Sequence, residues 1–170
     1  MSMPTEIKAA RTDDGYVIRV EGRGTLRESP AVREFAAQCL DQRRELTLSV
    51  DLFACEYLDS TFLGCLVGLY RRGQQEPNLR LTVCAEPETR RRLLGATRLD
   101  KLFHCVDNCP EPAGPWAPLS APQLEKRDFG LHVLECHQRL SELPCPSAPA
   151  FKAVADQLAR ELGQSQPGTP

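Results

Sequence analysis

Residues 46–70, LTLSVDLFACEYLDSTFLGCLVGLY, decide the fold. Apolar residues alternate from Leu46 to Leu52 and then recur at intervals of three and four from Phe62 to Tyr70. Alternation is typical of a half-buried strand, whereas the second spacing is typical of a helix with one buried face. The stretch therefore predicts a strand, a short loop and a buried-face helix.

Two polar residues stand where this helix begins. Asp59 is the expected N-cap, because its carboxylate can accept from amides two or three residues on and would lie at the positive end of the helix dipole. Ser60 then falls on the first turn, and its hydroxyl would project at the C-terminal edge of a sheet, where open α/β folds place functional groups. By itself, a serine there could simply satisfy a free backbone amide.

The flanking sequence extends the same alternation of strands and helices. Further strands are expected over 15–22, 79–85 and 102–106, and further helices from Ser29, as N-cap before Pro30, and from residue 86. Polar residues occupy alternate strand positions, so one sheet face is much less apolar than the other. We predict an α/β fold with a mixed sheet of four to five strands and helices mainly on one face. The pairing direction of the first two strands stays open.

The composition changes after residue 107, where five prolines fall within sixteen residues. We expect a main domain over 1–107, an extended Pro-rich linker over 108–123, a helical hairpin over 124–163 and a disordered tail over 164–170. Trp116, the only tryptophan, either pins the linker to the domain or is exposed.

The hairpin is predicted from two apolar stripes, 129–143 and 151–162, separated by a proline-rich break. Neither stripe can be buried by its own helix. The hairpin could therefore cap the polar sheet face, form a homodimer or dock a second partner. Gly64 and Gly68, one turn apart on the central helix, indicate close packing against the sheet or a neighbouring helix rather than a phosphate loop.

The order strand, Asp59-Ser60-Thr61, then a helix with small residues resembles the STAS domain of bacterial anti-sigma factor antagonists. The resemblance covers roughly residues 5–107. It implies a phosphoprotein in a partner-switching system that regulates transcription, with Ser60 as the phosphorylated residue and Thr61 as the alternative acceptor. Many members have Gly-Leu after the hydroxyl residues, whereas this chain has Phe62-Leu63-Gly64.

The same resemblance implies the partners. The unphosphorylated form would bind an anti-sigma factor or a serine/threonine switch kinase of the GHKL-type ATPase class, and a PP2C-type phosphatase would reset the switch. ATP belongs to the kinase, so no cofactor is expected here. A constitutive STAS subunit of a transporter or lipid-transport complex, or a ligand-sensing module, is the alternative.

Individual residues around Ser60 have competing interpretations. The expected partner-binding residues are Tyr57, Leu58, Asp59, Ser60, Thr61 and Phe62. Leu58 and Phe62 could instead belong to the core. Asp51 and Asp59 would orient the hydroxyl or a kinase-bound metal, or serve only as a strand-end turn residue and a helix cap.

Other classes of function are disfavoured. The formal net charge of -2 gives no reason to expect nucleic acid or an anionic membrane surface. With no apolar run of membrane-spanning length and no export signal, we expect a cytoplasmic protein with reduced cysteines. An enzyme is not expected, because Ser60 lacks the flanking glycines of a nucleophile elbow. A metal site is not expected either, because only Cys105 and Cys109 approach ligand spacing.

Overall fold

A computed structural model of the chain describes residues 3–42 and 45–164. Its strands run in the order β6-β5-β3-β2-β1-β7, with β4 beside β2. The strands are β1 (Glu6–Arg11), β2 (Gly15–Gly24), β3 (Leu46–Asp51), β4 (Cys55–Leu58), β5 (Leu79–Cys84), β6 (His104–Val106) and β7 (Ala117–Pro118). The helices are α1 (Ser29–Gln42), α2 (Ser60–Gln75), α3 (Pro87–Leu94), η1 (Gly95–Thr97), α4 (Leu99–Leu102), α5 (Lys126–Ser141) and α6 (Ala148–Gln164).

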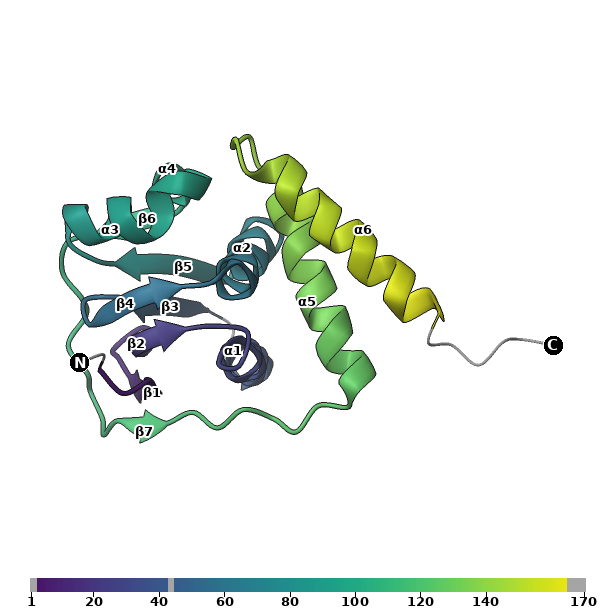
Figure 1. Ribbon diagram of the computed structural model, residues 1–170. Coiled ribbons are helices and arrows are strands. Elements are labelled where there is room, and N and C mark those ends of the chain that lie inside the picture. Colours follow the sequence, from purple (N-terminus) through teal and green to yellow (C-terminus); the bar gives the residue numbers. More distant parts are fainter. Residues whose placement is uncertain (1–2, 43–44, 165–170) are drawn as a thin grey trace.

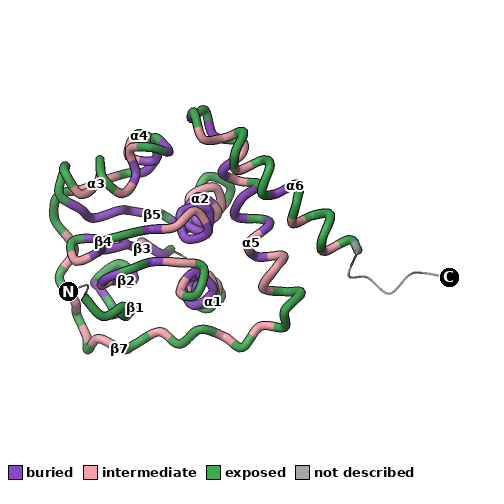
Figure 2. The backbone as a smooth tube through the Cα atoms, in the orientation of Figure 1, coloured by how far each residue is buried: buried purple, intermediate pink, exposed green. Residues whose placement is uncertain are grey.

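The predicted α/β class is confirmed. β2, β3, β5 and β6 pair in parallel, whereas β1 is antiparallel to both β2 and β7. The direction left open is thereby settled, since β2 and β3 are parallel. α1 and α2 lie next to each other, and the α5–α6 hairpin lies beyond them (Figure 1). The core fills the space between the strands and α2, while most of α6 remains exposed (Figure 2).

Three strands were not predicted, and each lacks a readable pattern. β1 contains two alanines and three charged residues among its six, β4 has only four residues, and β7 is a two-residue pairing that includes a proline. The expected end of the strand over 15–22 is also wrong, because β2 continues to Gly24. Gly22 has φ +76° where the register with β4 shifts. Glycine adopts this conformation at low cost, so the strand continues through a bulge.

The start of α1 corrects the predicted cap. Ser29 is the first residue of the helix, and its side chain points to His132 rather than to a backbone amide. The cap lies four residues earlier, where the Thr25 hydroxyl accepts from the Arg27 amide and the Glu28 carboxylate accepts from the Thr25 amide. These reciprocal bonds form a capping box.

The Pro-rich segment is extended but is not a free linker. It must pass from the β6 edge of the sheet to the β7 edge, and it does so on the side away from the α5–α6 hairpin (Figure 1). Arg19 and Cys84 alternate with core residues and therefore face that side. The Arg19 guanidinium lies 4.2 Å from the centre of the Trp116 ring, and the Cys84 thiol shares a hydrogen bond with Cys109. Trp116 therefore pins the segment.

The C-terminal hairpin packs on α2 and on itself. Leu140 and Leu143 join the buried cluster that includes the sheet and α2, and the Gly130 backbone lies against the Leu162 side chain. Val154, expected on the buried stripe of α6, is 43% exposed. Of the three roles considered, the hairpin does not cap the polar sheet face. Within residues 3–42 and 45–164, no helix has the length and apolar character to cross a membrane.

Replacing Leu140 by alanine should lower the free energy of unfolding of the whole chain by about 2–5 kcal/mol, because this fully buried side chain joins α5 to the main core. Urea unfolding followed by circular dichroism measures the change. The matched Val154→Ala variant, on the exposed side of α6, should stay within about 0.5 kcal/mol of the unmodified protein. Equal unfolding midpoints for Leu140→Ala and Val154→Ala would contradict this account.

Candidate functional site

Asp59 caps α2 as predicted. One carboxylate oxygen accepts from the Phe62 amide at 2.8 Å, and the other accepts from the Leu26 amide at 2.8 Å. The same side chain therefore starts α2 and ties it to the loop between β2 and α1. Both oxygens bind amides, whereas the Ser60 Oγ is hydrogen bonded to His137, so Asp59 does not orient the Ser60 hydroxyl.

Ser60 is held by a residue that the sequence did not indicate. Its Oγ lies 3.0 Å from Nε2 of His137, on α5, 77 positions later in the chain. The His137 Nδ1 donates to the main-chain oxygen of Val133 at 2.9 Å. The carbonyl oxygen can only accept, so Nδ1 carries a proton, and the hydrogen bond to Ser60 is made by Nε2. Ser60 itself is half-buried.

A second serine–histidine pair joins α5 to the start of α1. The Ser29 Oγ lies 2.8 Å from Nε2 of His132, and an Arg33 nitrogen lies 3.0 Å from its Nδ1. Arginine can only donate, so Nδ1 accepts and the Nε2 proton is directed at Ser29. Burial, followed by the nearby charges of Arg33 and Arg139, lowers the pKa of His132 to about 4. This imidazole is therefore neutral in the folded protein.

The predicted close packing at the two glycines is confirmed, and the neighbour is α5. A side chain at Gly64 would meet the Cys136 main-chain oxygen at 2.4 Å. A side chain at Gly68 would meet only the end of the Arg139 side chain, at 2.8 Å. One turn further on, Arg71 pairs with Glu142. The contact thus continues from Gly64 to Arg71 on one side and from Cys136 to Glu142 on the other, and it is tightest at Gly64.

The other predicted site residues divide by exposure. Tyr57 is 43% exposed, and the Arg23 guanidinium lies 4.3 Å from its ring centre. Leu58 and Phe62 are buried, which is the core alternative, and Thr61 is buried as well. Of the expected partner-binding residues, Tyr57 is therefore exposed, whereas these three are not.

Asp51 lies on the other face of the sheet. It pairs with Arg19 at 2.8 Å and accepts from the Phe53 amide at 3.0 Å. Asp51 is thus a turn residue at the end of β3. The expectation that Asp51 orients the Ser60 hydroxyl is wrong. His137 takes that place. His137 could have been suspected from the sequence, because the spacing Val133, His137, Leu140 puts a histidine on the buried face of α5.

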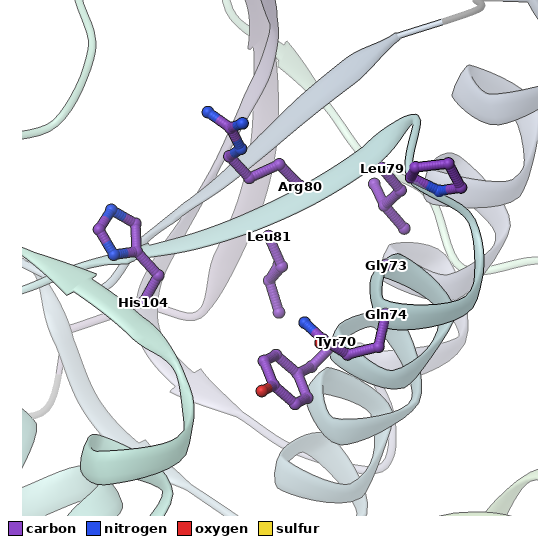
Figure 3. A pocket seen from close by; sticks show the side chains of 8 residues that line it. Tyr70, Gly73, Gln74, Leu79, Arg80, Leu81 and His104 are labelled. Atoms are coloured by element: carbon purple, nitrogen blue, oxygen red, sulfur yellow. The ribbon is translucent and has the colours of Figure 1, made fainter.

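The geometry does not assemble a metal site or a triad. In the described part of the chain, no group of three His, Cys, Asp or Glu residues could hold a metal ion. The Ser60–His137 pair has the spacing of a nucleophile and base, but the third partner is the Val133 carbonyl rather than a carboxylate. A cavity of about 400 Å³ lies instead between α2 and β5, with His104 at its rim (Figure 3).

The parallel strands β2, β3 and β5, with Ser60 at the start of α2, form the arrangement of a STAS-type domain. Residues 7–104, more than half of the chain, match the family model described as "Mlab, STAS domain". The chain belongs to this family.

A solved structure extends the comparison. The chain is similar to the crystal structure of an anti-sigma factor antagonist from Mycobacterium paratuberculosis, with 27% sequence identity and a TM-score of 0.51. The similarity covers 92% of that chain but 64% of this one, so more than a third of this chain lies outside it. Among curated proteins, no sequence matches the chain.

The buried His132 predicts a pH dependence of stability. The unfolded chain takes up a proton at this histidine below its ordinary pKa of 6.5, whereas the folded protein does so only near pH 4. The free energy of unfolding should therefore fall by up to about 3 kcal/mol as the pH drops from 6.5 to 4, at about 1.4 kcal/mol per pH unit. Denaturation midpoints across this range measure it.

The control compares His132→Gln with His104→Gln, which removes an exposed histidine. Only His132→Gln should flatten the pH dependence. Equal slopes in both variants would show that another group is responsible.

Proposed function

We propose that the chain is an anti-sigma factor antagonist, a binding protein that captures an anti-sigma factor through the surface around the start of α2 and releases it when Ser60 carries a phosphate. The family match and the similarity to the Mycobacterium paratuberculosis antagonist support this class of function. The observation that carries the proposal is the position of Ser60, half-buried on the first turn of α2 and directly after the capping Asp59.

The electrostatics of that position suit a switch. A phosphate on Ser60 would add about 1.5 to 2 negative charges next to the Asp59 carboxylate. The α2 N-terminus would stabilise part of that charge within this chain. A partner approaching the same surface would meet like charge and lose solvent from it, and each ~1.4 kcal/mol of such cost weakens binding tenfold.

The apolar part of the binding surface lies beside Ser60. Tyr57 is 43% exposed, and Leu26, whose amide binds Asp59, is 38% exposed. Exposed aromatic and aliphatic side chains next to a charge-sensitive group are the composition expected of a protein interface. In this cycle the kinase is the anti-sigma factor itself, a GHKL-type ATPase, and a PP2C-type phosphatase restores the hydroxyl.

Replacing Ser60 by aspartate should weaken binding to a purified anti-sigma factor kinase of the same organism at least tenfold, because the new carboxylate lies beside Asp59. Ser60→Ala should bind at least as tightly as the unmodified protein and take up no phosphate from ATP. Calorimetry and mass spectrometry of the Ser60 peptide give the two readouts. Ser120→Asp, which adds the same charge on the exposed linker, is the control. Equal affinities for all variants would refute the switch.

Truncating Tyr57 to alanine tests the apolar part of the surface. We expect a loss of about 1–3 kcal/mol in binding free energy to the same partner, the range of an aromatic interface residue. The matched Leu102→Ala variant removes another exposed apolar side chain, 37% exposed on α4, and should bind normally. Surface plasmon resonance measures both. If Tyr57→Ala and Leu102→Ala have the same affinity, the binding surface lies elsewhere.

A second candidate function is a STAS subunit of a stable assembly, in which Ser60 is never phosphorylated. The Ser60–His137 hydrogen bond favours it, because the hydroxyl already has a partner within the chain. Mass spectrometry of the Ser60 peptide from the native host distinguishes the two. A phosphorylated fraction supports the switch, and its absence under all growth conditions supports the assembly subunit.

A further inference from the structure

The C-terminal hairpin covers the N-terminal start of α2, where the proposed function places the partner. Two buried histidines of α5 reach the first residues of α1 and α2, with Ser29 bound to His132 and Ser60 bound to His137. These histidines are 1% and 6% exposed. The hairpin therefore lies against both helix starts, and the Ser60 hydroxyl points at it rather than at solvent.

The packing leaves little space for anything else. At Gly64 the α2 backbone lies against the Cys136 main chain, and even a methyl group would overlap it. The Cys65 thiol is enclosed where α1, α2 and α5 meet, with its Sγ 3.6 Å from the Ser29 main-chain oxygen. A protein that approaches Ser60 in this state would meet α5 first.

A phosphate does not fit this arrangement. The Ser60 Oγ and the His137 Nε2 are 3.0 Å apart, so the phosphorus and its oxygens would have to occupy the volume of the imidazole ring. Since α5 is in backbone contact with α2 at Gly64, it cannot make room by a small shift. Modification of Ser60 and docking of the hairpin therefore exclude each other.

We propose that the hairpin competes with the partner for the same surface. When the hairpin is docked, it covers Ser60, and an anti-sigma factor can bind the start of α2 only after α5 has moved away. This inference rests on the proposed function for the identity of the partner. The hairpin is the resting occupant of the surface. Tyr57 stays outside it, 43% exposed, and provides a first contact for the incoming protein.

The connection to the main domain permits such a movement. The Leu119 amide still binds the Ile7 main-chain oxygen at the sheet edge, and α5 begins at Lys126. Residues 120–125 between them belong to no helix or strand and are mostly exposed. They can act as a hinge while the segment before them keeps its place on the sheet.

The competition has a quantitative consequence. The apparent affinity for a partner falls in proportion to the fraction of molecules in the open state, so about 1% open molecules would mean about 100-fold weaker binding. Any change that loosens the hairpin without altering the partner surface should therefore strengthen partner binding. The two glycines of α2 provide such a change and its control.

The test compares Gly64→Ala with Gly68→Ala in the full chain. The first places a methyl group against the Cys136 backbone, whereas the second meets only the guanidinium end of the Arg139 side chain. The probe is N-ethylmaleimide, with the labelling rate of each cysteine followed by peptide mass spectrometry. In Gly64→Ala, Cys65 and Cys136 should react at least tenfold faster than in the unmodified protein, and in Gly68→Ala within about twofold.

Cys55, buried in β4 and away from the hairpin, is the internal standard. Its rate should stay unchanged in both variants. Unchanged rates at Cys65 and Cys136 in Gly64→Ala, or equal acceleration of Cys55, would overturn the proposal, because the hairpin would then open only with the whole fold. His137→Ala provides a second variant, also expected to accelerate Cys136, should Gly64→Ala not fold.

Binding of the purified anti-sigma factor kinase separates this inference from the proposed function. Gly64→Ala should bind several-fold more tightly than Gly68→Ala. If Ser60→Asp weakens binding but Gly64→Ala and Gly68→Ala bind equally, the switch stands and the competition is refuted. If labelling shows an open hairpin in Gly64→Ala but no variant binds the partner, the proposed function fails while the opening remains established.

Discussion

The contact between the start of α2 and α5 is the interaction on which the arrangement depends. A hydroxyl that would face solvent in an isolated α/β domain is instead hydrogen bonded to an imidazole 77 positions away. The Ser60–His137 bond can form because residue 64 is glycine. A side chain at this position would overlap the Cys136 main chain and push α5 away from α2. Small residues thus set the separation of two helices, and that separation determines what surrounds the serine.

This contact links chemistry to architecture. The N-terminus of α2 attracts negative charge, and the Asp59 cap already uses that attraction. A second negative group at Ser60 would disturb two neighbours at once, the Asp59 cap on one side and the His137 imidazole on the other. Ser60 is therefore both a contact that holds the hairpin in place and the residue at which added charge would disturb the proposed partner surface. A change at Ser60 affects both.

The local elements could be predicted from the sequence, because each carries its own pattern. The strand at 46–52, the cap at Asp59, the helix after it and both hairpin helices all follow from spacing and end signals. β4 and β7 could not be predicted, since four and two residues carry no periodicity and are held only by the strands they pair with.

The candidate site was predicted in part. The sequence predicted the positions of Ser60 and Asp59, and it indicated close packing at Gly64 and Gly68. It did not reveal His137 as the partner of Ser60, nor that Asp51 turns to Arg19, because both depend on which surfaces meet in three dimensions. A histidine within an apolar seam signals a specific polar partner but not its identity.

The most direct test of the central claim is the protonation state and hydrogen bonding of His137, measured by nitrogen-15 NMR of the histidine side chains in the full chain. The account predicts a ring whose Nδ1 proton is held by the Val133 carbonyl and whose Nε2 is hydrogen bonded to Ser60. It also predicts that the Nε2 signal shifts when Ser60 is replaced by alanine. A ring that averages between tautomers as in free histidine, and that does not respond to Ser60→Ala, would contradict it.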